Sequence, residues 1–204
     1  THASIQDNKQ SNMISFKAFI VAAVLALTIS CPSALGHPAA ENNESDSPFA
    51  QAIATLDSKT FKATFYMLGG ERGITFIGVI DTSVGATGEY PYHVHEKPVP
   101  ANGDCEATGG HFDPYKKKGA TCDRASLAEC EQGDLSGKFG KLSINTVNKG
   151  KTDFITYQDG SINLADNEQS ITNRSIVVHS PDGKRIACAN IVKQPINFGT
   201  IFST

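Results

Sequence analysis

Short runs of β-branched and aromatic residues are the feature that most limits what this chain can fold into. Turn residues (Gly, Asp and Asn) separate the runs, and no long stripe of apolar residues shows the 3.6-residue period of an amphipathic helix. The runs lie at residues 49–56, 60–67, 73–80, 90–95, 141–146, 154–157, 174–179 and 185–192. This pattern predicts an all-β domain, either an antiparallel sandwich or a barrel.

The N-terminal residues are predicted to precede the mature protein. Residues 1–12 precede Met13, the only sensible start methionine, so we expect them to be an upstream leader outside the fold. Residues 13–36 have a short charged start, an apolar stretch and small residues at the end, which is typical of a secretory signal peptide. A membrane anchor is the alternative, but the apolar stretch is shorter than the ~20 residues that a span needs.

The signal peptide predicts a secreted, extracellular protein, either freely secreted or associated with a cell wall. Residues 37–47 are polar and form a flexible tail, and residues 48–204 form the domain. Asn43 and Asn173 each begin a glycosylation sequon. The net charge of −3 does not suggest a nucleic-acid or membrane-surface partner.

Four cysteines follow the signal peptide, and three of them lie in the long segment 97–138 that has no strand pattern. In an oxidising compartment four cysteines suggest two disulfides, with three possible pairings. Cys122 and Cys130 can close a short loop, and Cys105 and Cys188 would then tie the long segment to a late strand. Such a long segment inside a compact domain is usually functional or pinned.

Four histidines, His93, His95, His111 and His179, are the only ones after residue 37. His93 and His95 are two residues apart in an expected strand, so their side chains share a face. Two imidazoles on one face of a strand make half of a transition-metal site. One complete site can be built from the four, and no histidine remains for a second.

Several motifs, in the same order along residues 49–192, resemble those of the copper/zinc superoxide dismutases. They are His93-Val-His95-Glu, Gly110-His111-Phe-Asp-Pro114, Gly133-Asp134-Leu135, Ser175-Ile-Val-Val-His179 and Arg185-Ile-Ala-Cys188. The resemblance implies an eight-stranded antiparallel Greek-key β-barrel, an immunoglobulin-like sandwich, with one long disulfide-pinned loop. It also implies copper ligation by all four histidines, an internal Cys105–Cys188 disulfide, and Arg185 as the group that receives the anionic substrate.

The sequence departs from the zinc-containing members of that family. No histidine lies between Phe112 and Gly133, and Glu131 stands where the last zinc histidine is expected, three residues before Asp134. Two oxygen ligands and one imidazole make a poor zinc site. The gap between His179 and Arg185 is also short. Both departures resemble the copper-only superoxide dismutases that fungi secrete.

The resemblance therefore implies a superoxide dismutase with one copper ion per chain and no zinc. The resemblance implies that His111 leaves copper on reduction and carries a proton to the product. We expect Glu131 to orient His111, and Asp134 to lock a neighbouring ligand or, alternatively, to accept backbone N–H bonds in its own turn.

Two other functions remain open. The alternative to an enzyme is a non-enzymatic copper-binding or copper-delivery β-barrel, although Arg185 beside the metal has no use in a carrier. A structural β-domain that has lost its activity is a third reading, and retention of all four histidines disfavours it. Superoxide is the expected small-molecule substrate, and a monomer is the expected state.

Overall fold

The structure is a computed structural model, which describes residues 50–118 and 122–195. These residues belong to one of two compact units, Asn42–Thr204, and the other unit, Thr1–Glu41, lies outside the described residues. The expected leader, signal peptide and polar tail (residues 1–47), with the sequon at Asn43, also lie outside them and stay predictions. Within the described part, no helix has the length and hydrophobicity needed to cross a membrane.

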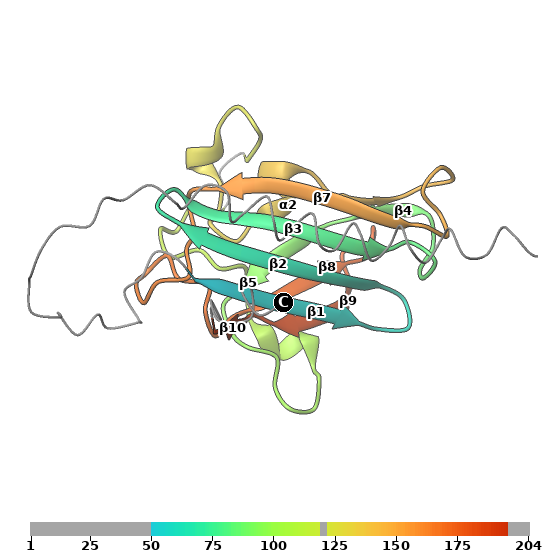
Figure 1. Ribbon diagram of the computed structural model, residues 1–204, viewed down its shortest axis with the longest axis horizontal. Helices are drawn as coiled ribbons and strands as arrows, with labels where there is room; N and C mark the ends of the chain where they lie inside the picture. Colours follow the sequence, from blue (N-terminus) through green and yellow to red (C-terminus); the bar gives the residue numbers. More distant parts are fainter. Residues whose placement is uncertain (1–49, 119–121, 196–204) are drawn as a thin grey trace, which may run out of the picture. The chain divides into compact units, whose positions relative to one another are not determined.

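The larger sheet has five antiparallel strands in the order β10-β1-β2-β3-β7 (Figure 1). Their bounds are Gln51–Asp57 (β1), Lys62–Gly70 (β2), Gly73–Asp81 (β3), Thr152–Asp159 (β7) and Val192–Gln194 (β10). In β1, β2 and β3 alternate residues are buried, because successive side chains of a strand point to opposite faces. One face of this sheet therefore packs on the core.

The domain has two smaller antiparallel sheets, and one of them carries three of the four histidines. One pairs β4 (Gly88–Tyr90) with β6 (Leu142–Ile144). The other has the order β5-β8-β9, with bounds Tyr92–His95, Ser175–His179 and Arg185–Asn190. Every residue of β5 and β8 is buried, so these two strands lie inside the domain rather than at its surface.

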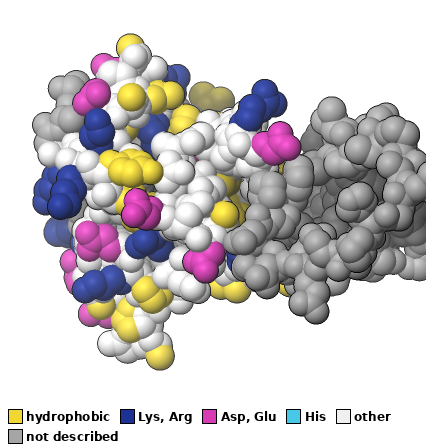
Figure 2. Space-filling view, turned by 90° about the vertical axis from the view of Figure 1, so that its left-hand side faces the viewer, with side chains coloured by type: hydrophobic (Ala, Val, Ile, Leu, Met, Phe, Trp, Pro, Cys, Tyr) yellow, Lys and Arg dark blue, Asp and Glu magenta, His cyan; other side chains and the backbone are white. Residues whose placement is uncertain are grey.

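The core lies between the larger sheet and the smaller ones (Figure 1). Phe65 of β2 stacks on Tyr92 of β5 with ring centroids 5.7 Å apart, so aromatic contact joins the two layers directly. The Tyr92 hydroxyl donates a hydrogen bond to the hydroxyl of Tyr157 in β7, at 3.0 Å. On the face seen in Figure 2, basic and acidic side chains are interspersed rather than gathered by sign.

The long connection between β5 and β6 contains three short helices and two disulfides. The helices are η2 (Cys105–Thr108), η3 (Leu127–Glu129) and α2 (Leu135–Phe139). Cys105 bonds to Cys188 of β9, and Cys122 bonds to Cys130 within the connection. These are the two pairs expected from the sequence, and the Cys105–Cys188 disulfide fixes the connection against the sheet that holds three of the histidines.

The all-β, antiparallel character predicted from the sequence is confirmed, and the number of strands differs. Ten strands lie in the described part, in three sheets that are not joined there into one closed hydrogen-bonded barrel. The predicted run 90–95 is divided at Pro91, which has no N–H to donate. The run 185–192 is divided at Ile191, whose N–H bonds to the carbonyl of Arg174 as the chain passes from one sheet to another.

Candidate metal centre

The four predicted histidines lie in one cluster. His93 and His95 are on β5, His179 ends β8 beside a register shift in the β8–β9 ladder, and His111 pairs with His95 through an isolated β-bridge. One nitrogen from each ring forms a group in which all four atoms lie within 4.8 Å of one another. Within residues 50–118 and 122–195, these four form the one group of His, Cys, Asp or Glu side chains with metal-binding geometry.

His95 and His179 each bond to a backbone carbonyl on the side away from the cluster. His95 Nδ1 lies 3.0 Å from the carbonyl oxygen of Gly109 and 3.1 Å from the hydroxyl of Thr108. His179 Nδ1 lies 3.1 Å from the carbonyl oxygen of Gly183. A carbonyl oxygen only accepts, so each Nδ1 carries the hydrogen and each Nε2 presents a lone pair.

His93 and His111 each face a carboxylate instead. His111 Nδ1 lies 2.5 Å from Glu131 Oε2, and His93 Nε2 lies 3.4 Å from Asp134 Oδ1. The carboxylates hold the hydrogen on these nitrogens, which leaves His111 Nε2 and His93 Nδ1 for a metal. The sequence expectation that Glu131 and Asp134 stand beside copper ligands therefore matches their positions.

Two further observations test whether the cluster fits a metal ion. His93 Nδ1 is buried and has no hydrogen-bond partner in the described structure, and such an atom is costly to leave without a partner. The Nε2 atoms of His95 and His179 lie 3.4 Å apart, each presenting a lone pair to the other. A cation between them satisfies all three atoms at once. Four imidazoles suit copper in both of its valences, so the residues fit that metal.

Burial keeps the rings of His93, His95 and His179 neutral, which is the form that binds metal. Desolvation lowers the pKa of His93, His95 and His179 below the usual histidine value. For His95 the positive charge of Arg185 adds to burial, and the pKa falls to about 3. These imidazoles are therefore unprotonated at neutral pH and have their lone pairs available.

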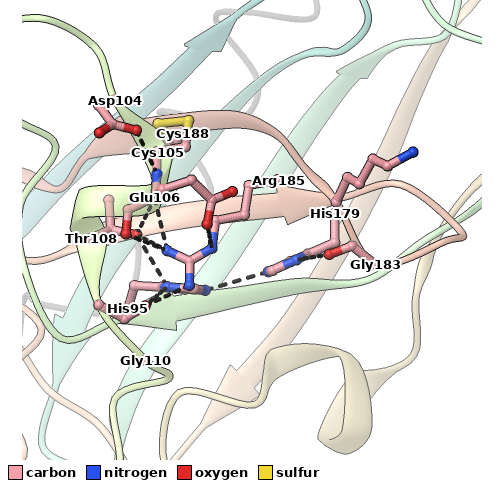
Figure 3. A network of polar contacts seen from close by, with 12 residues as sticks. His95, Asp104, Cys105, Glu106, Thr108, Gly110, His179, Gly183, Arg185 and Cys188 are labelled. Carbon is pink, nitrogen blue, oxygen red and sulfur yellow. Dashed lines mark hydrogen bonds and ion pairs between the residues drawn. A yellow bond between two sulfur atoms is a disulfide. The ribbon is translucent and has the colours of Figure 1, made fainter.

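Arg185 lies at the edge of the cluster, beside His95 (Figure 3). Its Nη1 donates to the carbonyl oxygens of Cys105 (2.8 Å) and Glu106 (3.2 Å) and to the hydroxyl of Thr108 (2.9 Å), and its Nη2 donates to the carbonyl oxygen of Gly109 (2.7 Å). The Cys105–Cys188 disulfide joins this turn to the strand that carries the arginine. The guanidinium is thus held at a fixed place next to a metal ligand.

A close backbone approach brings the two acids to the histidines. Gly133 N donates to the carbonyl oxygen of Phe112 at 2.7 Å, and Val94 N donates to that of Gly133 at 2.9 Å. A Cβ at Gly133 would lie 2.4 Å from the Val94 carbonyl oxygen, so only glycine allows this contact. Asp134, the next residue, also caps α2 by accepting from Gly137 N at 2.8 Å. Asp134 therefore lies beside both groups considered for it, the His93 ring and a backbone N–H of its own turn.

Several groups of the site were not predicted from the sequence. The carbonyl oxygens of Gly109 and Gly183 belong to the backbone, and Thr108 is a buried threonine three residues before His111. Lys138 is buried and donates to the carbonyl oxygen of Gln132, between the two acids. Of these groups, only Thr108 has a signal in the sequence, because a hydroxyl residue stands three positions before the predicted ligand His111.

The fold and the site define an all-β metalloprotein with one four-imidazole centre and an arginine beside it. The sequence matches the copper/zinc superoxide dismutase (SODC) family over residues 63–191. The chain therefore belongs to this family of copper-dependent oxidoreductases, which confirms the predicted enzyme class and cofactor.

Relatives and solved structures place the chain near cell-surface members of the family. It is 32% identical to cell surface superoxide dismutase [Cu-Zn] 4 of Candida albicans, over 86% of this chain and 71% of the relative. It is 44% identical to cell surface Cu-only superoxide dismutase 5 of the same species, over 51% of this chain and 42% of the relative, so this match spans less than half of that protein. The Cu(II) structure of superoxide dismutase 5 superposes with a TM-score of 0.60 at 34% identity, covering 76% of this chain and 99% of the other. The names of these relatives support the predicted secreted, extracellular location with a cell-wall association.

Proposed function

We propose that this chain is a secreted superoxide dismutase that converts superoxide to oxygen and hydrogen peroxide at a mononuclear copper site without zinc. One observation carries the proposal: four imidazole nitrogens converge while the other nitrogen of each ring faces an oxygen acceptor. When bound, copper would supply the one-electron exchange with superoxide, and the ion would be held by His93, His95, His111 and His179.

The chain's own residues supply binding and proton handling. Arg185 offers a fixed positive charge and N–H donors beside His95, where an anion is drawn toward the centre. His111 carries, at Nε2, one of the protons that hydrogen peroxide requires. Glu131 accepts from Nδ1 of the same ring and keeps its orientation when Nε2 is free. Asp134 fixes the His93 ring in the same way from the loop.

The absence of zinc is supported by how the two acids are used. Glu131 directs an oxygen at the outer nitrogen of His111, the nitrogen that a zinc ion would otherwise meet, and Asp134 directs an oxygen at the outer nitrogen of His93. Between them and His111 the sequence has no further histidine. A proton shared with a carboxylate thus takes the orienting role of a second metal.

We also propose that the strands form the family's eight-stranded Greek-key barrel. If β4 and β5 are one strand interrupted at Pro91, the smaller sheets become a single layer in the order β6-β4/β5-β8-β9. β10 continues β9 past Ile191 and pairs with β1, which links this layer to the larger sheet. Counted in this way, the ten strands become eight.

We propose that the protein acts as a monomer on superoxide and has no nucleic-acid or membrane partner. The mixed signs of charge on the face seen in Figure 2 and the small net charge support the absence of a nucleic-acid or membrane partner. Asn173 is exposed, in a turn just before β8, so glycosylation there is compatible with the fold.

Metal analysis of the purified protein, paired with a superoxide assay before and after copper addition, tests the proposal. We expect about one copper and no zinc per chain, because one complete set of imidazole ligands exists. Activity should rise in proportion to bound copper. Stoichiometric zinc in the cysteine-pinned connection would contradict the proposed metal content. Full copper loading without activity would favour the copper-binding or copper-delivery alternative.

A further inference from the structure

The two edges of the Arg185 guanidinium have different surroundings (Figure 3). The Nη edge is held by groups of the 105–109 turn, through Cys105, Thr108 and Gly109. The Nε edge faces the carboxylate of Glu106, with Nε and Oε2 3.5 Å apart. The first set of contacts fixes the arginine, and the second places a negative charge at the entry for an anion.

The Glu106 contact is weak and open to solvent. The Glu106 side chain is 74% exposed, whereas that of Arg185 is 18% exposed. An exposed ion pair at this separation gains little, because water screens it and the side chain loses freedom. The backbone of Glu106 is placed independently, since its N–H bonds to Asp104 Oδ1 at 2.9 Å. Its carboxylate can therefore leave the arginine without disturbing the turn.

A small anion and the Glu106 carboxylate seek the same donors. Nη2 of Arg185 has one acceptor among the described residues, the carbonyl of Gly109, so its other N–H and the Nε–H form the edge that an anion can reach. Like charges repel across a few ångströms of partly screened solvent.

We propose that Glu106 restrains the enzyme by competing with the anionic substrate for the Nε edge of Arg185. In this role Glu106 lowers the affinity of the site for anions in general. The inference rests on the proposed function of Arg185 as the anion-receiving group. It predicts that loss of the carboxylate makes the site a better anion receptor.

A purely structural role for Glu106 predicts the opposite sign. If the carboxylate were needed to hold Arg185, its removal would free the guanidinium and weaken anion binding. The hydrogen bonds from the Nη atoms of Arg185 to the turn remain when the Glu106 side chain changes, since the contact with residue 106 among them uses its backbone oxygen. We therefore expect the arginine to keep its place.

Glu106→Gln in the copper-loaded protein tests the proposal through two measurements. Azide titration followed by the Cu(II) absorption spectrum gives anion affinity, and stopped-flow superoxide decay gives kcat/KM. We expect both to rise about 2- to 3-fold at low ionic strength, and the gain to shrink toward wild type in about 0.5 M salt. Glu106→Asp retains the charge at a shorter reach and should show a smaller gain.

Glu129→Gln is the matched control. Glu129 forms a similar exposed ion pair, 3.6 Å from Lys117, on η3 rather than beside Arg185, and its removal should change neither measurement. Unchanged or weaker azide binding by Glu106→Gln, with wild-type copper content, would overturn the inference. Inactive copper-loaded wild type would instead defeat the proposed function, while the azide comparison would still report on Glu106.

Discussion

The two halves of the metal centre hold their imidazoles with different acceptors, backbone carbonyls in one half and carboxylates in the other. His95 and His179 bond through Nδ1 to the carbonyl oxygens of Gly109 and Gly183. Both rings stand on paired strands of one sheet, and the acceptors follow from the path of the chain. We call this pair, with its carbonyls, the carbonyl half.

The other half depends on side chains from the long connection. His93 and His111 face Asp134 and Glu131, which lie at the start of α2 and just before it. We call this pair, with its acids, the carboxylate half. A carboxylate adds a negative charge that one substitution can remove. A backbone carbonyl is neutral and cannot be removed by changing a side chain. The carboxylate half is therefore the tunable part of the centre, and it needs its own support.

That support is the buried ion pair between Lys138 and Asp159. Lys138 Nζ donates to the carbonyl oxygen of Gln132, to Asp159 of β7 and to the hydroxyl of Ser161, which uses all three of its hydrogens. The Lys138 and Asp159 side chains are each 2% exposed. The contact with Gln132 fixes the backbone between Glu131 and Asp134. In the carbonyl half, the backbone is fixed by the pairing of β8 with β5 and β9.

The largest effect is expected from Lys138→Met, which breaks this support and leaves Asp159 buried without its partner. The free energy of unfolding should fall by about 3–5 kcal/mol. Urea unfolding of the metal-free protein measures it. Lys138→Met combined with Asp159→Leu removes both charges and should lose less than the single variant.

Lys62→Met is the control for this loss. Lys62 pairs with Asp57 at 2.7 Å, but both side chains are exposed, so stability should hardly change. An equally small loss in Lys138→Met would show that the carboxylate half does not depend on the buried pair.

The strands were largely predictable because a half-buried strand leaves a two-residue period, as in β1, β2 and β3. The break at Pro91 also had a signal, since proline cannot donate to a ladder. The break at Ile191 had none: an isoleucine continues an apolar run, and only the sheet change explains it. A local pattern carries the period of a strand but not the sheet that it joins.

The second largest effect is expected from Glu131→Gln, which neutralises one acceptor of the carboxylate half. An amide still reaches His111 Nδ1 but no longer stabilises a positive charge on that ring. We expect turnover at full copper loading to fall about 10- to 100-fold with the fold intact. Superoxide decay normalised to bound copper measures this, and wild-type turnover would remove Glu131 from the mechanism.

The site was predictable as far as its chemistry lies in side chains of characteristic type. The four histidines were recognised because imidazole has a known use as a copper ligand, and Arg185, Glu131 and Asp134 were found through the resemblance to the superoxide dismutase family. The carbonyls of Gly109 and Gly183 have no residue type to recognise. Lys138 was not found because lysine is rarely buried, and nothing in the sequence marks this one as an exception.

The smallest effect is expected from Thr108→Val, which acts on the carbonyl half. The Thr108 hydroxyl accepts from Arg185 Nη1, lies 3.1 Å from His95 Nδ1 and donates to the carbonyl oxygen of Cys105. Valine removes these contacts, but His95 keeps the Gly109 carbonyl and Arg185 keeps the backbone oxygens of the turn. We expect kcat/KM to fall about 3-fold and unfolding free energy to fall by about 1 kcal/mol.

Thr108→Ser retains the hydroxyl and should restore kcat/KM to near the wild-type value. The comparison with Glu131→Gln then separates the two halves, because a redundant backbone acceptor protects one ring and a single carboxylate serves the other. A loss in Thr108→Val as large as that in Glu131→Gln would mean that backbone carbonyls do not make the carbonyl half robust. The difference between the halves would then lie in the strands themselves rather than in the acceptors.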